Sequence, residues 1–228
     1  SYIRYLQATH MDYQLVRSKR RTLALRVAPD GQIEVRAPLR LGRRHIDDFV
    51  REHQDWIRRQ QDYWRTRPRQ HWRDGDTVLH LGRPVRLNLV EAARTRVGLE
   101  DDILTVAMPR PATEELVREA VEAWWRRLAR DEFQRSIERQ FHWFAARGHG
   151  VPVLRIKKMR TRWGSLSQRG YINLNLALMR YDLEVIDYVV MHELCHLEYA
   201  HHGPQFHALM DRRMPDWRRR KQRLDQSL

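Results

Sequence analysis

Five of the chain's 12 histidines fall in the short segment 191–207. Within it, His192, Glu193 and His196 fit the pattern H-E-x-x-H. On a helix, residues i and i+4 lie one above the other, about 5–6 Å apart at Cβ, so both imidazoles can reach one zinc ion. Glu193 points toward the same metal-bound water and can accept its proton. The spacing therefore predicts a catalytic zinc centre, with an accidental match in a histidine-rich segment as the alternative.

A catalytic zinc needs a third protein ligand and one open position for water. Three further histidines follow the motif: His201, His202 and His207. His202 is preferred because it lies six residues beyond His196, the offset of the metzincin signature. His207 is the second choice, and His201 is expected at the surface. Metzincins have glycine where this chain has Tyr199, so we expect the backbone to leave the helix later, within 201–204.

The elements that must position this cluster follow from hydrophobic periodicity and turn residues. Alternating residues predict hairpins over 13–37 and 153–178 and strands over 77–82, 85–90 and 103–109. Helical spacing predicts helices over 42–67 and 114–147, and Thr113 before two glutamates is typical of a capped start for the second. A further helix is predicted from an Asp182 N-cap through the histidines, then a short one after Gly203-Pro204 and a basic, solvated one at the C-terminus. These elements indicate an α+β protein with a strand-rich region over 11–110 and a catalytic domain over 111–228.

Composition limits where the protein works. Cys195 is the only cysteine, which excludes an intrachain disulfide and favours a cytoplasmic protein. The Cys195 side chain is expected to be a small packed residue. The longest apolar runs, such as LNLAL over 174–178, are far shorter than the roughly 20 residues of a membrane span, so no membrane partner is expected. Residues 1–10 lack a signal-peptide core and are interpreted as a vector-derived leader.

A net charge of +14 predicts attraction to phosphate polymers, because a basic surface releases counterions from nucleic acid. Lys157, Lys158 and Arg160 are the candidate nucleic-acid contacts, since they lie close in sequence to the expected cleft. The alternative is an arginine-rich exposed surface without such a partner, because net charge speaks only to non-specific binding.

Three segments carry a resemblance to a known family: RSKRRTLALRVAPDGQIEVRAP, TRWGSLSQRGYINLNLAL and IDYVVMHELCHLEYAHHGPQF. Residues 11–228 resemble the YgjP-like zinc metallopeptidases, relatives of SprT-like and WLM-type domains. The resemblance implies a zincin-like core, in which a small twisted sheet packs on the active-site helix, and places the third zinc ligand at His202. One departure is Leu166, where the family commonly has cysteine.

In folds of this kind, an edge strand beside the metal pairs with an extended peptide substrate. The resemblance makes YINLNLAL the strand expected near the site. The candidate substrate-binding residues are Arg162, Trp163, Asn173 and Asn175. The residue that stabilises the transition state stays open among three side chains: Arg162, Tyr199 and His207.

The favoured function is a zinc-dependent endopeptidase with Glu193 as its base. The relatives cleave proteins crosslinked to DNA, so the expected partners are a protein or peptide substrate and DNA, single-stranded or crosslinked to protein. One alternative is a metal-dependent UTP pyrophosphatase, which the absence of a G-x-x-x-x-G-K-[ST] loop disfavours. Another is a nucleic-acid-binding module whose structural zinc is closed by His207 or Cys195; such a site has no need of the Glu193 carboxylate.

Overall fold

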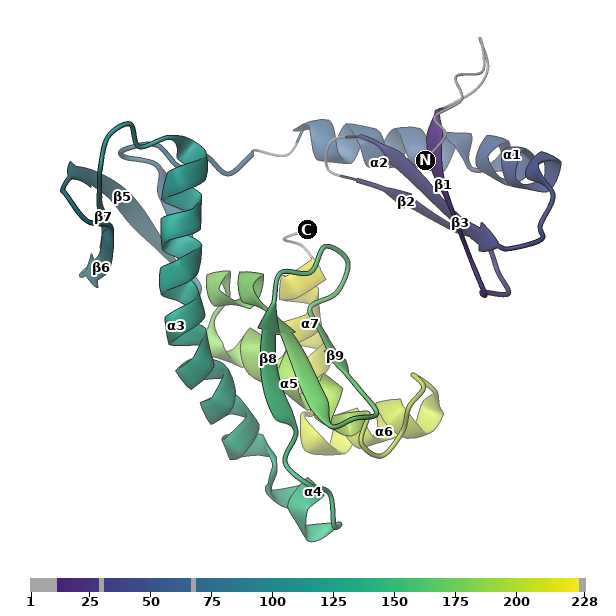
Figure 1. Cartoon of the computed structure of the whole chain (residues 1–228). Coiled ribbons are helices and arrows are strands. Elements are labelled where there is room, and N and C mark those ends of the chain that lie inside the picture. The colour runs from purple at the N-terminus through teal and green to yellow at the C-terminus, as the bar shows by residue number, and fades with distance from the viewer. Residues whose placement is uncertain (1–11, 29–30, 67–68, 226–228) are drawn as a thin grey trace. The chain divides into compact units, whose positions relative to one another are not determined.

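The chain forms two compact units, Ser1–Arg69 and Gln70–Leu228. A computed structural model describes residues 12–28, 31–66 and 69–225 (Figure 1). The interpretation of residues 1–10 as a leader therefore lies outside the described residues. The sequence analysis placed a boundary between residues 110 and 111, whereas the contacts place the division after Arg69. The strands that follow Gln70 belong to the same compact unit as the histidine cluster.

The first unit is a three-stranded sheet with two helices. Its strands are β1 (Tyr13–Ser18), β2 (Ala24–Val27) and β3 (Ile33–Pro38), and its helices are α1 (Arg43–Glu52) and α2 (Gln54–Thr66). The predicted hairpin is the antiparallel pair β2–β3, and β1 adds a parallel strand on the other side of β3. The single helix predicted over 42–67 is two helices, because the backbone leaves helical geometry at His53. Alternate residues of β3 are buried among apolar side chains from both helices.

The second unit begins with a four-stranded sheet in the order β4-β5-β7-β6. Its strands are β4 (Thr77–His80), β5 (Arg83–Glu91), β6 (Arg96–Glu100) and β7 (Ile103–Met108). The sequence analysis missed β6, which buries none of its residues completely. The buried side chains of β4, β5 and β7 share a core with the long helix α3 (Glu114–Gln140). Thr113 caps α3 by accepting from the Leu116 backbone N–H at 3.2 Å, as predicted.

A second sheet carries the active-site helix. It contains β8 (Val153–Lys157), β9 (Gly164–Leu166) and β10 (Tyr171–Asn175), in the order β8-β10-β9. The hairpin predicted over 153–178 is only the β9–β10 pair, whereas β8 runs parallel to β10. The end of the predicted segment is the 3-10 helix η1 (Leu176–Arg180). It starts at Asn175, whose side chain accepts from the Ala177 backbone N–H at 3.0 Å instead of extending the strand.

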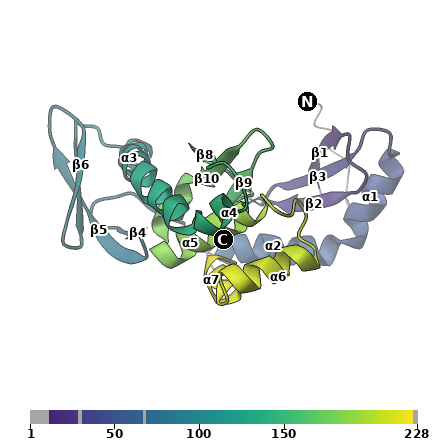
Figure 2. The same cartoon turned by 90° about the horizontal axis from the view of Figure 1, so that it is seen from below.

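Helix α5 (Leu183–Cys195) packs against this sheet and lies beside α3 (Figures 1 and 2). Its N-cap is Asp182, as predicted, which accepts from the Val185 backbone N–H at 3.1 Å. Helices α4 (His142–Ala146), α6 (Pro204–Arg213) and α7 (Trp217–Asp225) complete the unit. The helix predicted over 114–147 is interrupted at Phe141 and continues as α4.

The turn between β4 and β5 joins the four-stranded sheet to η1, which follows the second sheet in the chain. The backbone N–H groups of Leu81 and Gly82 donate to Met179 and Arg180 carbonyls at 2.8 and 2.9 Å. Gly82 has φ +80°, and a Cβ there would lie 2.9 Å from the Asp182 Cβ, so only glycine allows this approach. This contact explains why the strands of residues 77–108 belong to the same unit as α5.

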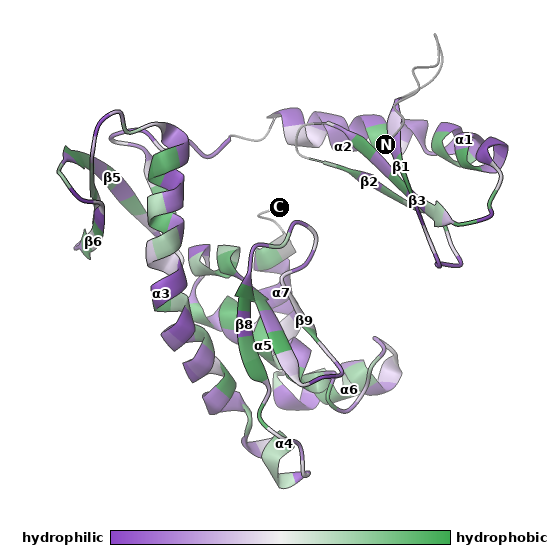
Figure 3. Ribbon diagram, in the orientation of Figure 1, coloured by the Kyte–Doolittle hydropathy of each residue, from purple (hydrophilic) through white to green (hydrophobic). Residues whose placement is uncertain are grey.

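One continuous core holds the second unit, built from both sheets, α3, α5 and the C-terminal helices. Hydrophobic and hydrophilic turns alternate along α3 (Figure 3), so its apolar side chains can face both sheets while its polar ones face water. The predicted α+β class is confirmed. In the part of the chain that is described, no helix is long and apolar enough to cross a membrane.

Candidate active site

Three histidine side chains converge at one point. The Nε2 atom of His202 lies 3.0 Å from the Nε2 atoms of both His192 and His196. Two nitrogens on one tetrahedral zinc at about 2.0–2.1 Å lie about 3.3–3.4 Å apart, so a small outward adjustment would admit the ion. Burial lowers the pKa of His192 to about 3, and the neighbouring histidines add to this effect. The imidazole therefore stays neutral, which is the form that binds a metal.

Phe206, on α6, forms the floor of this histidine cluster. Its ring centroid lies 4.9, 4.7 and 5.0 Å from those of His192, His196 and His202. The side chain is 1% exposed, so it cannot move aside without opening a void. The three imidazoles therefore rest on one aromatic ring, which restricts how far each can rotate.

The chain leaves α5 directly after Cys195, earlier than the predicted exit within 201–204. The backbone N–H groups of Leu197 and Glu198 bond three residues back, at 2.9 and 3.1 Å, which tightens the last turn. His196 Nδ1 lies 3.0 Å from the Tyr199 carbonyl oxygen. This contact makes Nδ1 the protonated nitrogen and leaves Nε2 with its lone pair toward the cluster. Tyr199 itself has no positive φ, so its position does not require glycine.

Glu198 anchors the loop that returns His202. Its carboxylate accepts a hydrogen bond from Arg147 and lies 3.0 Å from His149 Nε2, both in the segment after α4. The Arg147 hydrogen bond is the largest cause that lowers the pKa of Glu198. The side chain is only 13% exposed, so this ion pair is largely shielded from water. Glu198 therefore ties the ligand loop to a part of the chain outside the motif.

Glu193 is the buried carboxylate beside the cluster, 5% exposed. Burial raises its pKa to about 7, while the charge of Arg162 acts in the opposite direction. A carboxylate with a pKa near neutrality is suited to accept and return a proton. Its side chain lies against β9: a Cβ added at Gly164 would lie 3.0 Å from Glu193 Cγ and 3.1 Å from Oε2. Glycine at this position makes room for the carboxylate.

An open cleft of about 860 Å³ lies in front of these groups. Of the predicted site residues, it is lined by His192, Glu193, His196, His202, Arg162 and Trp163. Trp163 also packs edge-on against Tyr181, with ring centroids 5.3 Å apart. Of the three candidates for the transition-state stabiliser, only Arg162 is among the residues that line the cleft. Six of the predicted site residues are thus brought together around one cleft.

The two asparagines of β10 are buried and do not line the cleft. Asn175 Nδ2 donates to the Met159 and Arg162 carbonyls at 2.8 and 2.9 Å, which holds the loop between β8 and β9. Asn173 donates to Ser165 Oγ at 3.0 Å. Strand β10 is the central strand, flanked by β8 and β9, so it has no free edge for a peptide. The edge strand beside the cleft is β9 instead.

The three candidate nucleic-acid contacts lie apart from the cleft. Lys157 ends β8 and is exposed. Lys158 forms an ion pair with Glu122 of α3 at 2.8 Å, and with Arg160 it lines a different cavity. Their role in binding nucleic acid stays a prediction.

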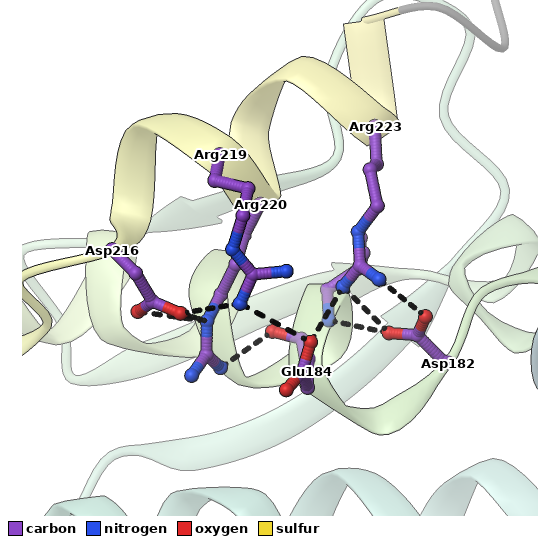
Figure 4. A network of polar contacts seen from close by, with 7 residues as sticks. Asp182, Glu184, Asp216, Arg219, Arg220 and Arg223 are labelled. Carbon is purple, nitrogen blue, oxygen red and sulfur yellow. Dashed lines mark hydrogen bonds and ion pairs between the residues drawn. The ribbon is translucent and has the colours of Figure 1, made fainter.

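The C-terminal helix holds the start of α5, contrary to the solvated helix expected from the sequence. Figure 4 shows Arg219, Arg220 and Arg223 of α7 among three acidic residues: Asp182 and Glu184 at the α5 N-terminus, and Asp216 just before α7. Arg223 pairs with Asp182 and Glu184, each at 3.0 Å, and Arg220 donates to the Glu184 carbonyl at 2.9 Å. Trp217 and Leu224 are buried on the inner side of the helix. This network fixes the end of α5 opposite to the histidine cluster.

His207, Cys195 and His201 do not join the three imidazoles. His207 Nδ1 lies 3.0 Å from the Gly203 carbonyl oxygen and its ring stacks on Trp217. Cys195 is fully buried, and burial raises the pKa of its thiol to about 12, as suits a packed residue. His201 is exposed. Within 12–28, 31–66 and 69–225, the cluster that could hold a metal consists of three residues, His192, His196 and His202.

Sequence reasoning missed the residues that surround the motif: Gly164, Ser165, Tyr188 and the floor residue Phe206. Gly164 and Ser165 belong to the quoted TRWGS segment, and the glycine there was the available signal. Tyr188 lies one turn before His192 on α5, lines the cleft, and stacks on Trp217. A residue four positions before a ligand shares its helical face, so this contact could have been inferred.

One of three comparisons with known proteins identifies the family of this chain. The model of the YgjP-like metallopeptidase domain matches residues 21–227, so the chain belongs to this family and is a metallopeptidase. A comparison with curated proteins finds no match. Among solved structures, the chain is similar to the metallopeptidase zymogen jannalysin of Methanocaldococcus jannaschii. The identity is 18%, the match covers 42% of this chain and 90% of that chain, and the TM-score is 0.37.

Proposed function

We propose that this metallopeptidase is a zinc-dependent endopeptidase whose metal is held by His192, His196 and His202. The observation that carries the proposal is the convergence of three Nε2 atoms beside a buried carboxylate in an open cleft. Three nitrogen ligands without a fourth protein ligand are typical of catalytic zinc. Zinc bound there would supply Lewis-acid polarisation of the scissile carbonyl and would acidify a water molecule.

Each residue of the cleft then has a role in peptide hydrolysis. Glu193 accepts the proton of the attacking water and passes it to the amine that leaves, for which a pKa of about 7 is suitable. Arg162 lies on the cleft wall, where a positive charge stabilises negative charge on the carbonyl oxygen. Strand β9 lines the cleft and has one neighbour, β10, so its second edge can pair with an extended substrate.

The base is tested by Glu193→Gln. This substitution keeps the shape of the side chain but removes the group that accepts the proton. We expect cleavage of an unfolded protein substrate to fall by at least about a hundredfold, because general base catalysis contributes about 10²–10⁴. Zinc content, measured by mass spectrometry, should stay at one ion per chain. An active variant would refute the assigned base.

The ligand set is tested by comparing His202→Ala with His207→Ala. We expect the first to lose zinc and activity, and the second to keep both, because His207 contacts the Gly203 carbonyl and is not one of the three clustered histidines. Chelation should inactivate the wild-type enzyme, and added zinc should restore activity. If His207→Ala loses zinc and His202→Ala keeps it, the third ligand is His207.

We further propose that the natural substrates are proteins bound or crosslinked to DNA. The support is the net charge of +14 and its uneven distribution: residues 1–69 hold 16 lysines and arginines against 8 acidic residues. Such a surface binds phosphate polymers with a strong salt dependence. We expect single-stranded DNA to accelerate cleavage of a DNA-bound protein, and 200 mM salt to remove that acceleration.

The two proposals fail separately. If the rate of cleavage does not change when DNA is added, only the proposed DNA-linked substrate is excluded. If the protein has full zinc content but cleaves no protein substrate, the proposed endopeptidase activity is refuted. The same preparation should be offered UTP with magnesium. Release of pyrophosphate without cleavage of any protein would favour a nucleotide hydrolase instead.

A further inference from the structure

A second cavity of about 420 Å³ lies in the Gln70–Leu228 unit, and none of its lining residues lines the catalytic cleft. Its apolar walls come from the segment before β4, from α3, from the β8–β9 loop and from η1. The apolar lining residues are Trp72, Val78, Trp125, Met159, Leu176 and Ala177. Trp72 and Trp125 pack edge-on with centroids 6.3 Å apart, so the cavity has aromatic walls. Its volume falls in the range of about 300–1,000 Å³ that is typical of small-molecule sites.

The charged residues that line this cavity are unbalanced. They comprise four cations, Arg118, Lys158, Arg160 and Arg180, and one carboxylate, Glu122. Glu122 is already paired with Lys158 at 2.8 Å. Arg118 reaches only Glu115, at 3.4 Å, and that carboxylate is 72% exposed. Such an exposed pair contributes little.

Arg160 and Arg180 have no carboxylate partner among residues 12–28, 31–66 and 69–225. Both residues line the cavity, Arg160 exposed and Arg180 half-buried, so two arginines there have no carboxylate in the described protein to balance their charge. Arginine binds phosphates and carboxylates through two parallel hydrogen bonds, which a neutral ligand would not satisfy. The charge of the cavity thus selects an anion, and its walls select an apolar body.

We propose that this cavity binds a small amphipathic anion: an aromatic or branched apolar group joined to a phosphate or a carboxylate. The apolar group lies against Trp72, Met159 and Leu176, and the anionic group faces Arg160 and Arg180. The apolar group by itself would leave the two arginines without an anion, and the anion by itself would leave the apolar walls without a contact. A nucleoside monophosphate and an N-acyl aromatic amino acid are the two sources of this chemistry.

The test is isothermal titration calorimetry on the full chain with zinc bound, using two sets of probes. One set is adenosine monophosphate, adenosine and inorganic phosphate. The other is N-acetylphenylalanine and its amide. We expect one of the two intact anions to bind. Its separate or neutralised halves should bind at least about tenfold more weakly, because each lacks either the charge-assisted hydrogen bonds or the apolar contacts. The set that binds identifies the source.

Variants separate this cavity from the catalytic cleft, which also attracts anions through its metal. Arg160→Gln and Arg180→Gln should each weaken binding by about tenfold. Arg94→Gln removes the same charge from an exposed turn and should leave binding unchanged. Three results would overturn the proposal. Either no probe binds at a concentration of about 10 mM, where only very weak binding would escape detection. Or the separate halves bind as tightly as the intact anion, or both cavity variants bind it with wild-type affinity.

Discussion

Gly164→Ala is the sharpest test of how the catalytic carboxylate is positioned. The added Cβ would lie 3.0 Å from Glu193 Cγ and 3.1 Å from Oε2, where ordinary contacts begin at 3.4 Å. It would also lie 3.2 Å from the Asn173 carbonyl oxygen of β10, so β9 cannot retreat to relieve the contact. Glu193 is 5% exposed and must move within a packed environment.

The expected loss of activity follows from how far these distances fall below an ordinary contact of 3.4 Å. The difference between 3.4 and 3.0 Å requires Glu193 Cγ to move by about 0.4 Å. A displacement of 1 Å at a catalytic group can reduce the rate about a hundredfold, so about 0.4 Å predicts a fall in kcat of about tenfold. Overpacking of this kind should also reduce the free energy of unfolding by about 1–3 kcal/mol.

The assay measures kcat, zinc affinity and the free energy of unfolding for Gly164→Ala beside a matched control. Gly98→Ala is that control, because Gly98 also lies in a strand and its added Cβ would meet nothing within 4 Å. We expect the control to keep wild-type kcat. Zinc affinity should be unchanged in both variants, since Glu193 is not among the three ligands.

Two results would refute this reasoning. Wild-type kcat in Gly164→Ala would mean that the carboxylate has more freedom than its burial indicates. A loss of zinc affinity in parallel with kcat would mean that the substitution acts through the whole site and not through Glu193.

Two further predictions concern the support of the site. Phe206→Ala should weaken zinc binding by about tenfold or more, because it removes the floor beneath all three imidazoles. Phe133 is buried to the same degree, so both substitutions should lower the free energy of unfolding by about 3–5 kcal/mol. Phe133→Ala should nevertheless leave zinc affinity unchanged. Equal losses of affinity would contradict the assigned role. His80 should make the fold acid-sensitive: burial lowers its pKa below 6.5, and its Nδ1 accepts from Trp125. The unfolded chain then takes up the proton first, so stability is complete above about pH 6.5 and falls below it. Urea unfolding at pH 7.5 and 5.5 should show a smaller fall in His80→Gln than in the wild type.

The sequence predicted what depends on neighbours along the chain. The pair His192 and His196 follows from helical spacing, and the caps Thr113 and Asp182 follow from side chains that accept from a backbone N–H nearby. The family resemblance pointed to His202, and the family itself is confirmed by the matched model. Each of these features has its cause within about ten residues.

What the sequence did not reveal depends on residues that are distant in the chain. Gly164 meets Glu193 only because β9 packs on α5, and Phe206 meets the imidazoles only because α6 folds back beneath them. The role of the C-terminal arginines was misjudged for the same reason, since their partners, such as Glu184, lie on α5. Alternation along 153–178 also could not distinguish a hairpin from a parallel pair, because both have a period of two.

The end of α5 shows how side chains can replace a glycine in the loop that follows an H-E-x-x-H helix. In the metzincin signature, glycine allows the chain to turn toward its third histidine. Here the chain leaves the helix after Cys195 without a positive φ. The contact of His196 with the Tyr199 carbonyl and the ion pair of Glu198 with Arg147 hold the turn instead. The position of the third histidine is therefore set in part by a residue from the segment after α4, outside the H-E-x-x-H motif, so substitutions there should affect the metal site.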